Sequence, residues 1–412
     1  MERLVLKLTM FHTLGLAVLS IYLGEWIRDK FPALKKYCLP GAVIGGTIFS
    51  IISLALYKAN IVELSFDYAT VNTLFYCIFF AASGAAASMA LLKKGGKLVI
   101  IFAILAAVLA ALQNVLAIGL GQLIGLNPLI SLMTGSIPMT GGHGNAAAFA
   151  PMAVKAGAPQ ALEVALAAAT FGLISGSIVG GPFGNFMIEH FHLQDPALDG
   201  KGKSEGEAAE GEEAATSHLT SPDVIRAVYY MMIACGMGSI FETVLKAIHV
   251  NFPIHVCCML GGILVRLYLD YGSKSQPSES IYEAMDTVGE FSLNLFVSMS
   301  IISMKLWQLT GMGAQLTILM VAQVVFILPF CYFLTFRLLG KNYDAAIMAV
   351  GHTGFGLGAV PVSMTTMQTV CRKYRYSRLA FFVVPVIGGF ISNISNAIII
   401  TEAINIAAGM MK

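Results

Sequence analysis

Ten apolar stretches, five on each side of an acidic segment, constrain the fold of this chain more than any other feature. Each is long enough for a helix to cross a hydrocarbon core of roughly 30 Å at about 1.5 Å per residue. None shows the alternation of an outer-membrane barrel strand, so membrane-spanning helices are predicted. The expected spans lie at about 8–26, 40–57, 70–92, 98–126, 161–188, 224–247, 254–271, 287–306, 313–336 and 379–408.

The composition supports an all-α integral membrane protein in contact with the lipid bilayer. Of the 412 residues, 57% are hydrophobic and only 12% are charged, whereas about a quarter of a typical soluble domain is charged. The formal net charge of +2 gives no basic field for nucleic acid, so no nucleic-acid partner is expected. The seven cysteines lack C-x-x-C or zinc spacing, and no resident cofactor is expected.

The distribution of lysine and arginine predicts the orientation of the chain. If the N-terminus is outside, the loops that fall inside carry most of the basic residues, at 28–36, 93–97, 337–341 and 372–378. Because this bias sets the orientation of short loops, both termini are expected outside. No small-residue cleavage site follows the first apolar run, which is therefore expected to be a retained span and not a signal peptide.

An acidic stretch at 193–222, rich in Gly, Ala and Ser, divides the chain into residues 1–192 and 223–412. Such a composition cannot bury enough apolar surface to fold alone, so it predicts a flexible cytoplasmic linker. "SGAAASM" at 83–89 matches "SMSIISM" at 298–304 in Ser, Ser and Met. Because each half has an odd number of spans, the second half must enter the membrane in the opposite sense. The sequence therefore predicts an inverted repeat, an arrangement typical of secondary transporters.

Two apolar segments are interrupted by residues that break helices. They lie between the fourth and fifth spans of each half, at about 129–156, with "GSIPMTGGHGN", and about 344–370, with "GHTGFGLGAVP". If either segment crossed the membrane completely, the basic loops would no longer fall on the same side of it. Each segment is therefore predicted to be a re-entrant hairpin. Unpaired backbone at a hairpin tip is costly in hydrocarbon. It offers N–H groups to a carboxylate and carbonyls to Na⁺. Close packing of Gly-rich helices is the structural alternative.

The side chains of these segments supply hydroxyls, imidazoles and amides. The candidate substrate-binding residues are Ser136, Thr140, Gly141, Gly142, His143, Gly144, Asn145, His352, Thr353, Gly354, Gly356 and Gly358. The candidate Na⁺ ligands are Asn393, Asn396, Gln368 and Thr365. A hydroxyl can instead bond the carbonyl four residues earlier. Each histidine can donate to an anion, relay protons or pack as a neutral group.

Amides also interrupt two flanking spans, in "QN" at 113–114 and "ISNISNAI" at 391–398. Polar groups at this depth mark ion and substrate paths, and interhelical packing bonds are the alternative. "GFGLG" at 354–358 lacks the full dinucleotide fingerprint, and the chain has no phosphate-binding loop motif. These absences argue against an ATP-driven pump, so an ion gradient is the expected energy source.

Four stretches resemble the bacterial sodium/glutamate symporter family: "GSIPMTGGHGNAAAF", "EVALAAATFGLISGSIVGGP" at 163–182, "GKNYDAAIMAVGHTGFGLGAVP" at 340–361 and "VVPVIGGFISNISNAIII" at 383–400. The resemblance implies two inverted five-span halves, each with a re-entrant loop, joined by a cytoplasmic linker. It also implies a homodimer in the bacterial inner membrane that takes up L-glutamate with Na⁺ by an elevator-like movement. Related carriers of citrate-like 2-hydroxycarboxylates share the fold and give the alternative substrate class.

Two other functional classes remain as hypotheses. An intramembrane enzyme requires paired carboxylates, a Ser/His pair or a zinc constellation within the spans, and Glu242 has no evident partner there. A passive channel predicts currents that do not saturate at low substrate concentration. The sequence thus favours a secondary active transporter, not an enzyme, with an anionic amino acid and Na⁺ as its substrates.

Overall fold

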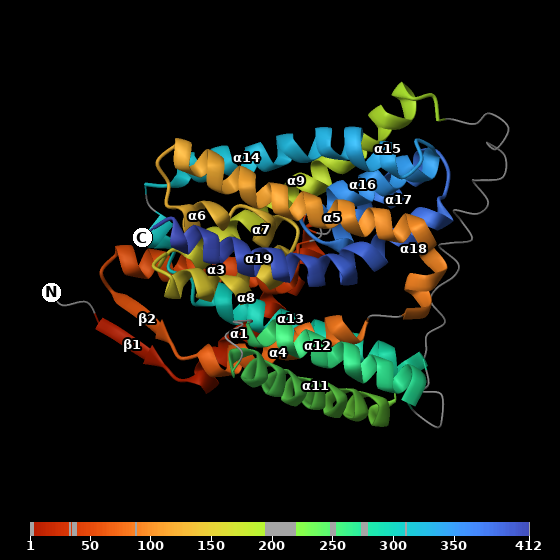
Figure 1. The fold of residues 1–412 in the computed structure, drawn as a ribbon. Coiled ribbons are helices and arrows are strands. Elements are labelled where there is room, and N and C mark those ends of the chain that lie inside the picture. The colour runs from red at the N-terminus through yellow and green to blue at the C-terminus, as the bar shows by residue number, and fades with distance from the viewer. Residues whose placement is uncertain are drawn as a thin grey trace.

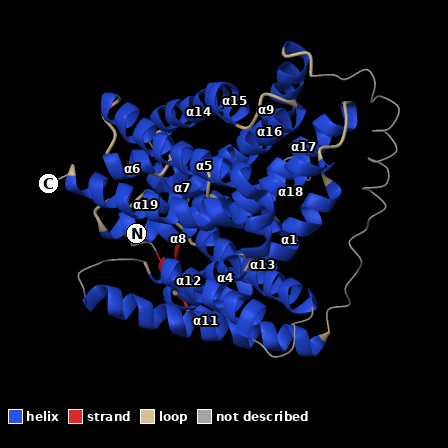
Figure 2. Cartoon of the chain, turned by 45° about the vertical axis from the view of Figure 1, so that its right-hand side comes forward, coloured by secondary structure: helices blue, strands red, loops and turns tan. Residues whose placement is uncertain are grey.

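The computed structural model describes residues 4–32, 34, 39–86, 89–193, 220–247, 253–272, 279–309 and 311–411. Helices dominate this part of the chain (Figures 1 and 2). Most of the predicted linker at 193–222 lies outside the described residues.

Eight helices or helix runs of the described chain are long and apolar enough to cross a membrane, which supports an all-α membrane protein. They are α1 (Met10–Lys30), α3 (Gly41–Lys58), the part of α5 (Met89–Leu123) from Gly96, α9 (Ala161–His190), α11 (Ser221–Ala247), α12 (Ile254–Leu267) with η2 (Tyr268–Gly272), α14 (Gly313–Phe330) with η4 (Cys331–Thr335) and α15 (Phe336–Leu338), and α18 (Arg378–Val386) with η5 (Ile387–Ile391) and α19 (Ser392–Gly409).

The other two expected spans are also helices. Helix α4 (Ala69–Ala85) has 17 residues and ends before the predicted boundary at 92. Helix α13 (Glu279–Ile302) has 24 residues and begins earlier than predicted, with an acidic first half. Their short length or their charge excludes both from the set of clearly apolar spans.

The helices pack into two groups. In the first group α4 packs against α12 and α13, α11 against α12, and α1 against α3. In the second group α5 packs against α14 and α19, and α9 packs against α8 (Gly142–Lys155), α16 (Tyr343–Leu357) and α17 (Val360–Lys373). Figure 1 shows α11, α12 and α4 below, and α5, α14 and α16 above. Each group combines helices from both halves of the chain.

Small residues bring the helix backbones close together within the first group. A Cβ added to Gly24 of α1 would meet the backbone of Gly41 and Gly45 of α3. Apolar side chains gain little from helix contact in lipid, so association depends on such close packing.

A two-stranded parallel sheet, which the sequence pattern did not predict, joins a strand before α1 to a strand between α3 and α4. Strand β1 (Leu4–Leu8) pairs with β2 (Val62–Phe66), with Leu4 opposite Val62 and Leu8 opposite Phe66. Figure 1 shows the sheet at the left, at the same end of the molecule as the C-terminus. The strands end at residues 8 and 66, so α1 begins two residues later than the predicted first span.

Both Gly-rich segments are broken helices. The first contains α6 (Pro128–Leu132), α7 (Ser136–Met139) and α8. The second contains α16 and α17, which pack against each other. Asn127 and Asn342 cap α6 and α16 by accepting backbone N–H bonds, as expected for N-cap residues. We call these the first and second broken segments.

Candidate functional site

The two broken segments meet at a pair of glycines. Gly142 begins α8 with a φ of +59°, a conformation that favours glycine. A Cβ added to Gly142 would lie 2.9 Å from the backbone oxygen of Gly358, the residue after α16. No larger residue fits at Gly142 without moving one of the two segments.

This meeting point brings helix ends of opposite polarity together. Helix α8 begins at Gly142, α16 ends at Leu357, and α17 begins at Val360. The start of a helix carries roughly half a positive charge and its end roughly half a negative charge. Free N–H groups at a helix start bind carboxylates, and free carbonyls at a helix end bind cations such as Na⁺.

A single amide on α5 connects both broken segments. Gln113 Nε2 donates to the Gly356 carbonyl at 2.7 Å, and Gln113 Oε1 accepts from Thr140 Oγ1 at 2.7 Å. Because Gly356 lies in the last turn of α16, its carbonyl lacks a partner within the helix. Gln323 of α14 donates to the backbone oxygen of Gln113 at 2.8 Å. Gln113 and Gln323 are both fully buried.

The neighbouring amide, Asn114, holds the start of α7. Asn114 Oδ1 accepts from the Ser136 backbone N–H at 2.8 Å. Ser136 Oγ donates to Asn396 Oδ1 at 2.7 Å, and Asn396 Nδ2 donates to the Ser136 carbonyl at 3.2 Å. Helix α19 is thus joined to the first broken segment by two hydrogen bonds at one residue.

The two candidate histidines have different surroundings. His143 Nε2 lies 2.9 Å from Thr170 Oγ1, and Thr170 donates its own proton to the Leu166 carbonyl. When Thr170 donates to that carbonyl, its oxygen can accept a proton from His143 Nε2. His352 Nδ1 lies 2.9 Å from Thr335 Oγ1, and its ring packs on Phe355 with a centroid distance of 4.8 Å.

Several buried polar atoms in this network have no hydrogen-bond partner among the described residues: Asn114 Nδ2, Asn145 Nδ2, Gln323 Oε1 and His352 Nε2. A buried polar atom without a partner costs about 1–3 kcal/mol. Two amide donors and one amide acceptor near the meeting point are the kind of groups that a ligand with carboxylates and a cation can satisfy.

The other candidate residues hold the segments in shape. Thr353 donates to Ala349 O and Thr365 to Pro361 O, which is the backbone bonding given above as an alternative. The remaining glycines allow close packing, Gly141 under the Asn145 side chain and Gly354 against Ser363, and a Cβ added to Gly144 would lie 3.3 Å from Leu293 and Phe79 of the first helix group.

The structure does not gather the predicted Na⁺ ligands as a set. Asn396 is buried and bonded to Ser136, whereas Asn393 is half-buried and donates to Gly389 O of the preceding turn. Gln368 is exposed on α17, and Thr365 bonds its own helix.

Sequence reasoning left out three residues of this network, Gln323, Thr170 and the His352 partner Thr335. Gln323 had a signal, because it is the one amide in the apolar run "ILMVAQVVFIL" at 318–328. Thr170 carried no such signal in the sequence, because its bond to His143 depends on where α9 passes that histidine.

Comparison with known proteins assigns the chain to a family. A sequence model described as sodium/glutamate symporter matches residues 6–376. The chain therefore belongs to the sodium/glutamate symporter family.

Individual sodium/glutamate symporters match nearly the whole chain. The protein of that name from Escherichia coli (strain K12) is 35% identical over 398 residues, which are 95% of this chain and 97% of the relative. The Shigella flexneri protein has the same identity and coverage. The Haemophilus influenzae protein is 32% identical over 399 residues, 94% of this chain and 95% of the relative. The family match includes both broken segments, and Asn396 lies beyond its end at residue 376.

Proposed function

We propose that this protein is a secondary active transporter, not an enzyme, and that it couples the uptake of L-glutamate to a Na⁺ gradient. The meeting of the two broken segments at Gly142 and Gly358 carries this proposal, because it places a helix start beside a helix end. The three relatives named above are all called sodium/glutamate symporters, which favours glutamate over citrate-like acids.

In this proposal a carboxylate of the substrate accepts from the N–H groups of the first turn of α8. Asn114 Nδ2 and Asn145 Nδ2, which lack partners, donate to it as well. Na⁺ lies beside it on the carbonyl oxygens at the end of α16 and on Gln323 Oε1. No arginine is needed, since the positive helix end and the cation supply the opposing charge.

We also propose that the broken segments are re-entrant hairpins in an inverted repeat of residues 1–192 and 223–412. The order of elements supports this arrangement, because among the described residues of each half four long helices precede a broken segment and a further helical span. The charge distribution then places both termini outside and the linker at 193–222 in the cytoplasm of a bacterium, with the protein in its inner membrane.

For transport we propose an elevator movement of the second helix group against the first. The network of Gln113, Ser136, Gln323 and Asn396 lies within the second group, so the site can travel as a unit. The contact of Gly144 with Leu293 and Phe79 belongs to the surface that slides. The first group is then the fixed scaffold and the place where two copies form a homodimer.

Purified protein in liposomes tests the proposed function. An inward Na⁺ gradient should drive accumulation of labelled L-glutamate above equilibrium, and collapse of the gradient should release it. Excess unlabelled citrate should compete poorly, whereas L-glutamate should compete fully. Uptake that does not depend on the Na⁺ gradient, or that does not saturate with glutamate concentration, would contradict a coupled carrier and favour a channel.

A further inference from the structure

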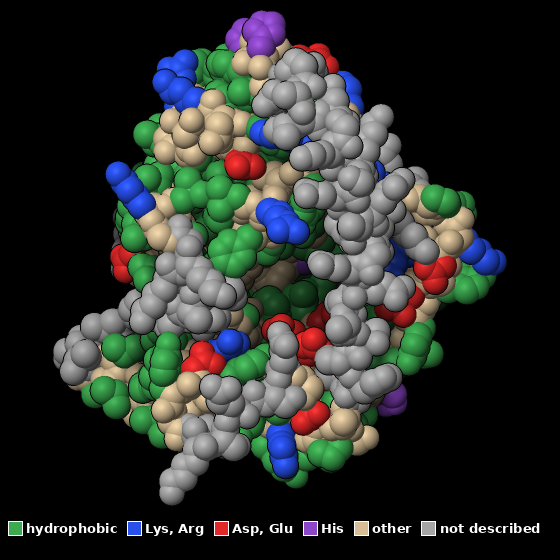
Figure 3. All heavy atoms as spheres, turned by 90° about the vertical axis from the view of Figure 1, so that its right-hand side faces the viewer, with side chains coloured by type: hydrophobic (Ala, Val, Ile, Leu, Met, Phe, Trp, Pro, Cys, Tyr) green, Lys and Arg blue, Asp and Glu red, His purple; other side chains and the backbone are tan. Residues whose placement is uncertain are grey.

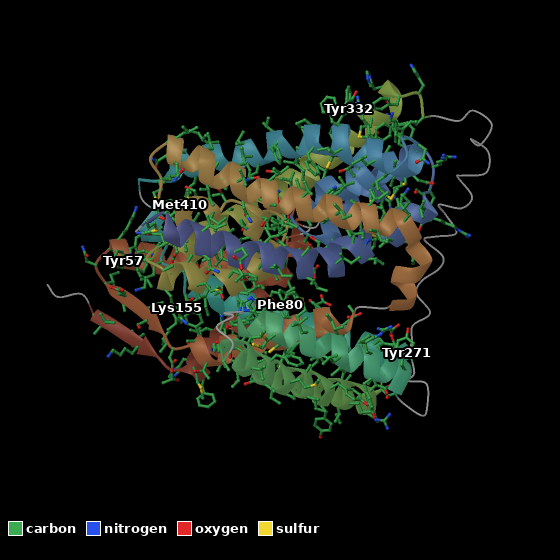
Figure 4. The ribbon with its side chains drawn as sticks, in the orientation of Figure 1. Tyr57, Phe80, Lys155, Tyr271, Tyr332 and Met410 are labelled. Carbon is green, nitrogen blue, oxygen red and sulfur yellow. The ribbon has the colours of Figure 1, made fainter. Side chains whose placement is uncertain are left out.

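An apolar groove of about 680 Å³ lies on the second helix group, away from the candidate site. Its walls come from α9 and from the end of α14 with η4, and α9 packs against α14. Its volume lies within the roughly 300–1,000 Å³ of ligand sites. Figure 4 shows Tyr332, one of its lining residues, at the upper edge of the molecule.

Two prolines line the groove, one on each wall. Pro182 lies inside α9 and Pro329 lies inside the last turn of α14. Proline removes a backbone donor and bends a helix. The π-helical turn η4 starts two residues after Pro329 and supplies Tyr332 and Phe333 to the second wall.

The side chains of the groove remain open to whatever surrounds the protein. Ile178 and Phe186 are each 53% exposed, and Phe333 is 54% exposed. For a helix pair in a membrane, the medium that covers such side chains is the acyl region of the bilayer. An apolar chain therefore fits the walls of the groove.

Charge and hydrogen-bonding groups are confined to one end of the groove. The guanidinium of Arg337 lies 5.3 Å from the centre of the Phe333 ring. The His190 ring stacks on Phe186 with a centroid distance of 5.3 Å and an angle of 15°. The nearby Glu189 carboxylate forms a salt bridge with Lys373 at 2.9 Å. The lysine offsets its negative charge, so Glu189 repels a bound anion less.

This end of the molecule also carries other basic side chains. Figure 3 shows Lys and Arg side chains at several places around it, next to hydrophobic surface. Basic residues at a membrane interface attract anionic headgroups, and aromatic side chains gather at the same level.

We propose that the groove binds one anionic phospholipid, with an acyl chain between Pro182 and Pro329 and the phosphate on Arg337 and His190. The apolar walls alone would accept any lipid chain. The Arg337 guanidinium at the end of the groove selects an anionic headgroup.

Native mass spectrometry of the full chain tests this proposal. The detergent-purified protein is incubated with equal amounts of phosphatidylglycerol and phosphatidylcholine that have the same acyl chains. We expect the protein to retain phosphatidylglycerol preferentially. Arg337→Gln should lower that preference about fivefold, the effect of one basic side chain near an anionic surface.

Two further variants separate a specific site from general attraction. Lys341→Gln removes the same charge from an exposed residue in the following loop and should leave the preference unchanged. Ile178→Trp fills the groove from a half-exposed position and should reduce retention of both lipids. Equal retention of the two lipids by the native chain, or an equal loss in Arg337→Gln and Lys341→Gln, would overturn the proposal.

Discussion

The contact between Gly142 and Gly358 gives the sharpest test of how the two broken segments work. Replacing Gly142 with alanine places a Cβ 2.9 Å from the Gly358 oxygen, where ordinary contacts begin near 3.4 Å. The two backbones must then separate by about half an ångström. Both atoms in conflict are fixed to backbone, so no flexible side chain can give way.

The left-handed backbone adds to this cost. Alanine at a φ of +59° is less stable than glycine by roughly 1–2 kcal/mol. Together with the displaced contact, the penalty for the state with both tips together is about 2 kcal/mol or more. A penalty of 2 kcal/mol lowers the population of that state about thirtyfold.

We therefore expect Gly142→Ala to lower Na⁺-driven uptake of labelled glutamate into liposomes about thirtyfold at low glutamate, with normal membrane insertion. Two variants separate the causes. Gly125 has a φ of +75°, and a Cβ added there meets no atom within 4 Å. Gly125→Ala therefore introduces the backbone strain without a steric contact. Gly236→Ala has neither.

Uptake by Gly125→Ala and Gly236→Ala should stay within about twofold of the native protein. Native uptake by Gly142→Ala would refute the role of the tip contact. An equal loss in Gly125→Ala would show that backbone strain alone explains the result.

Three further predictions concern buried hydrogen bonds. Gln113→Leu leaves a buried hydroxyl and a carbonyl without partners at about 1–3 kcal/mol each, so uptake at low glutamate should fall at least tenfold while the yield of folded protein by size-exclusion chromatography is kept. Asn396→Ala removes both hydrogen bonds to Ser136 at the start of α7 and should lower uptake at low glutamate at least tenfold, whereas Asn393→Ala, whose amide bonds its own helix, should leave uptake within twofold; equal losses would contradict a specific role of the Asn396–Ser136 bonds. The buried Glu163 accepts from the Lys305 N–H at 3.0 Å, so Glu163→Ala should lower the unfolding temperature by ~2 °C and Glu163→Gln, which keeps the acceptor, should not.

Much of the fold could be predicted from the sequence because a membrane leaves few choices. Apolar length alone located the helices, since a lipid core demands spans of one size and satisfied backbone. The predicted helix bounds were least accurate where the sequence is less apolar, as in α13. The β1–β2 sheet was missed because its formation depends on the pairing of two strands. Strand pairing between residues 4–8 and 62–66 depends on partners far apart in the sequence, which local patterns do not reveal.

The candidate side chains differ in the hydrogen-bond partners that the fold gives them. Ser136 and Thr140 were expected to lie at the site, and both bond groups from other helices. Thr353 and Asn393 were candidates of the same kind, and both bond their own helix. A hydroxyl or amide in a helix has either option, and only the position of neighbouring helices selects between them.

From composition and order alone the sequence predicts that the chain enters lipid and that glycine-rich breaks precede the last span of each half. These properties follow from composition and order, since hydrocarbon penalises unpaired backbone wherever it occurs. The meeting of Gly142 with Gly358 and the bonds of Gln113 to both segments are known only from the folded structure. Gly142 and Gly358, like Gln113 and Gly356, lie more than two hundred positions apart in the chain, so the packing of α5, α9 and α19 around the two segments decides these contacts.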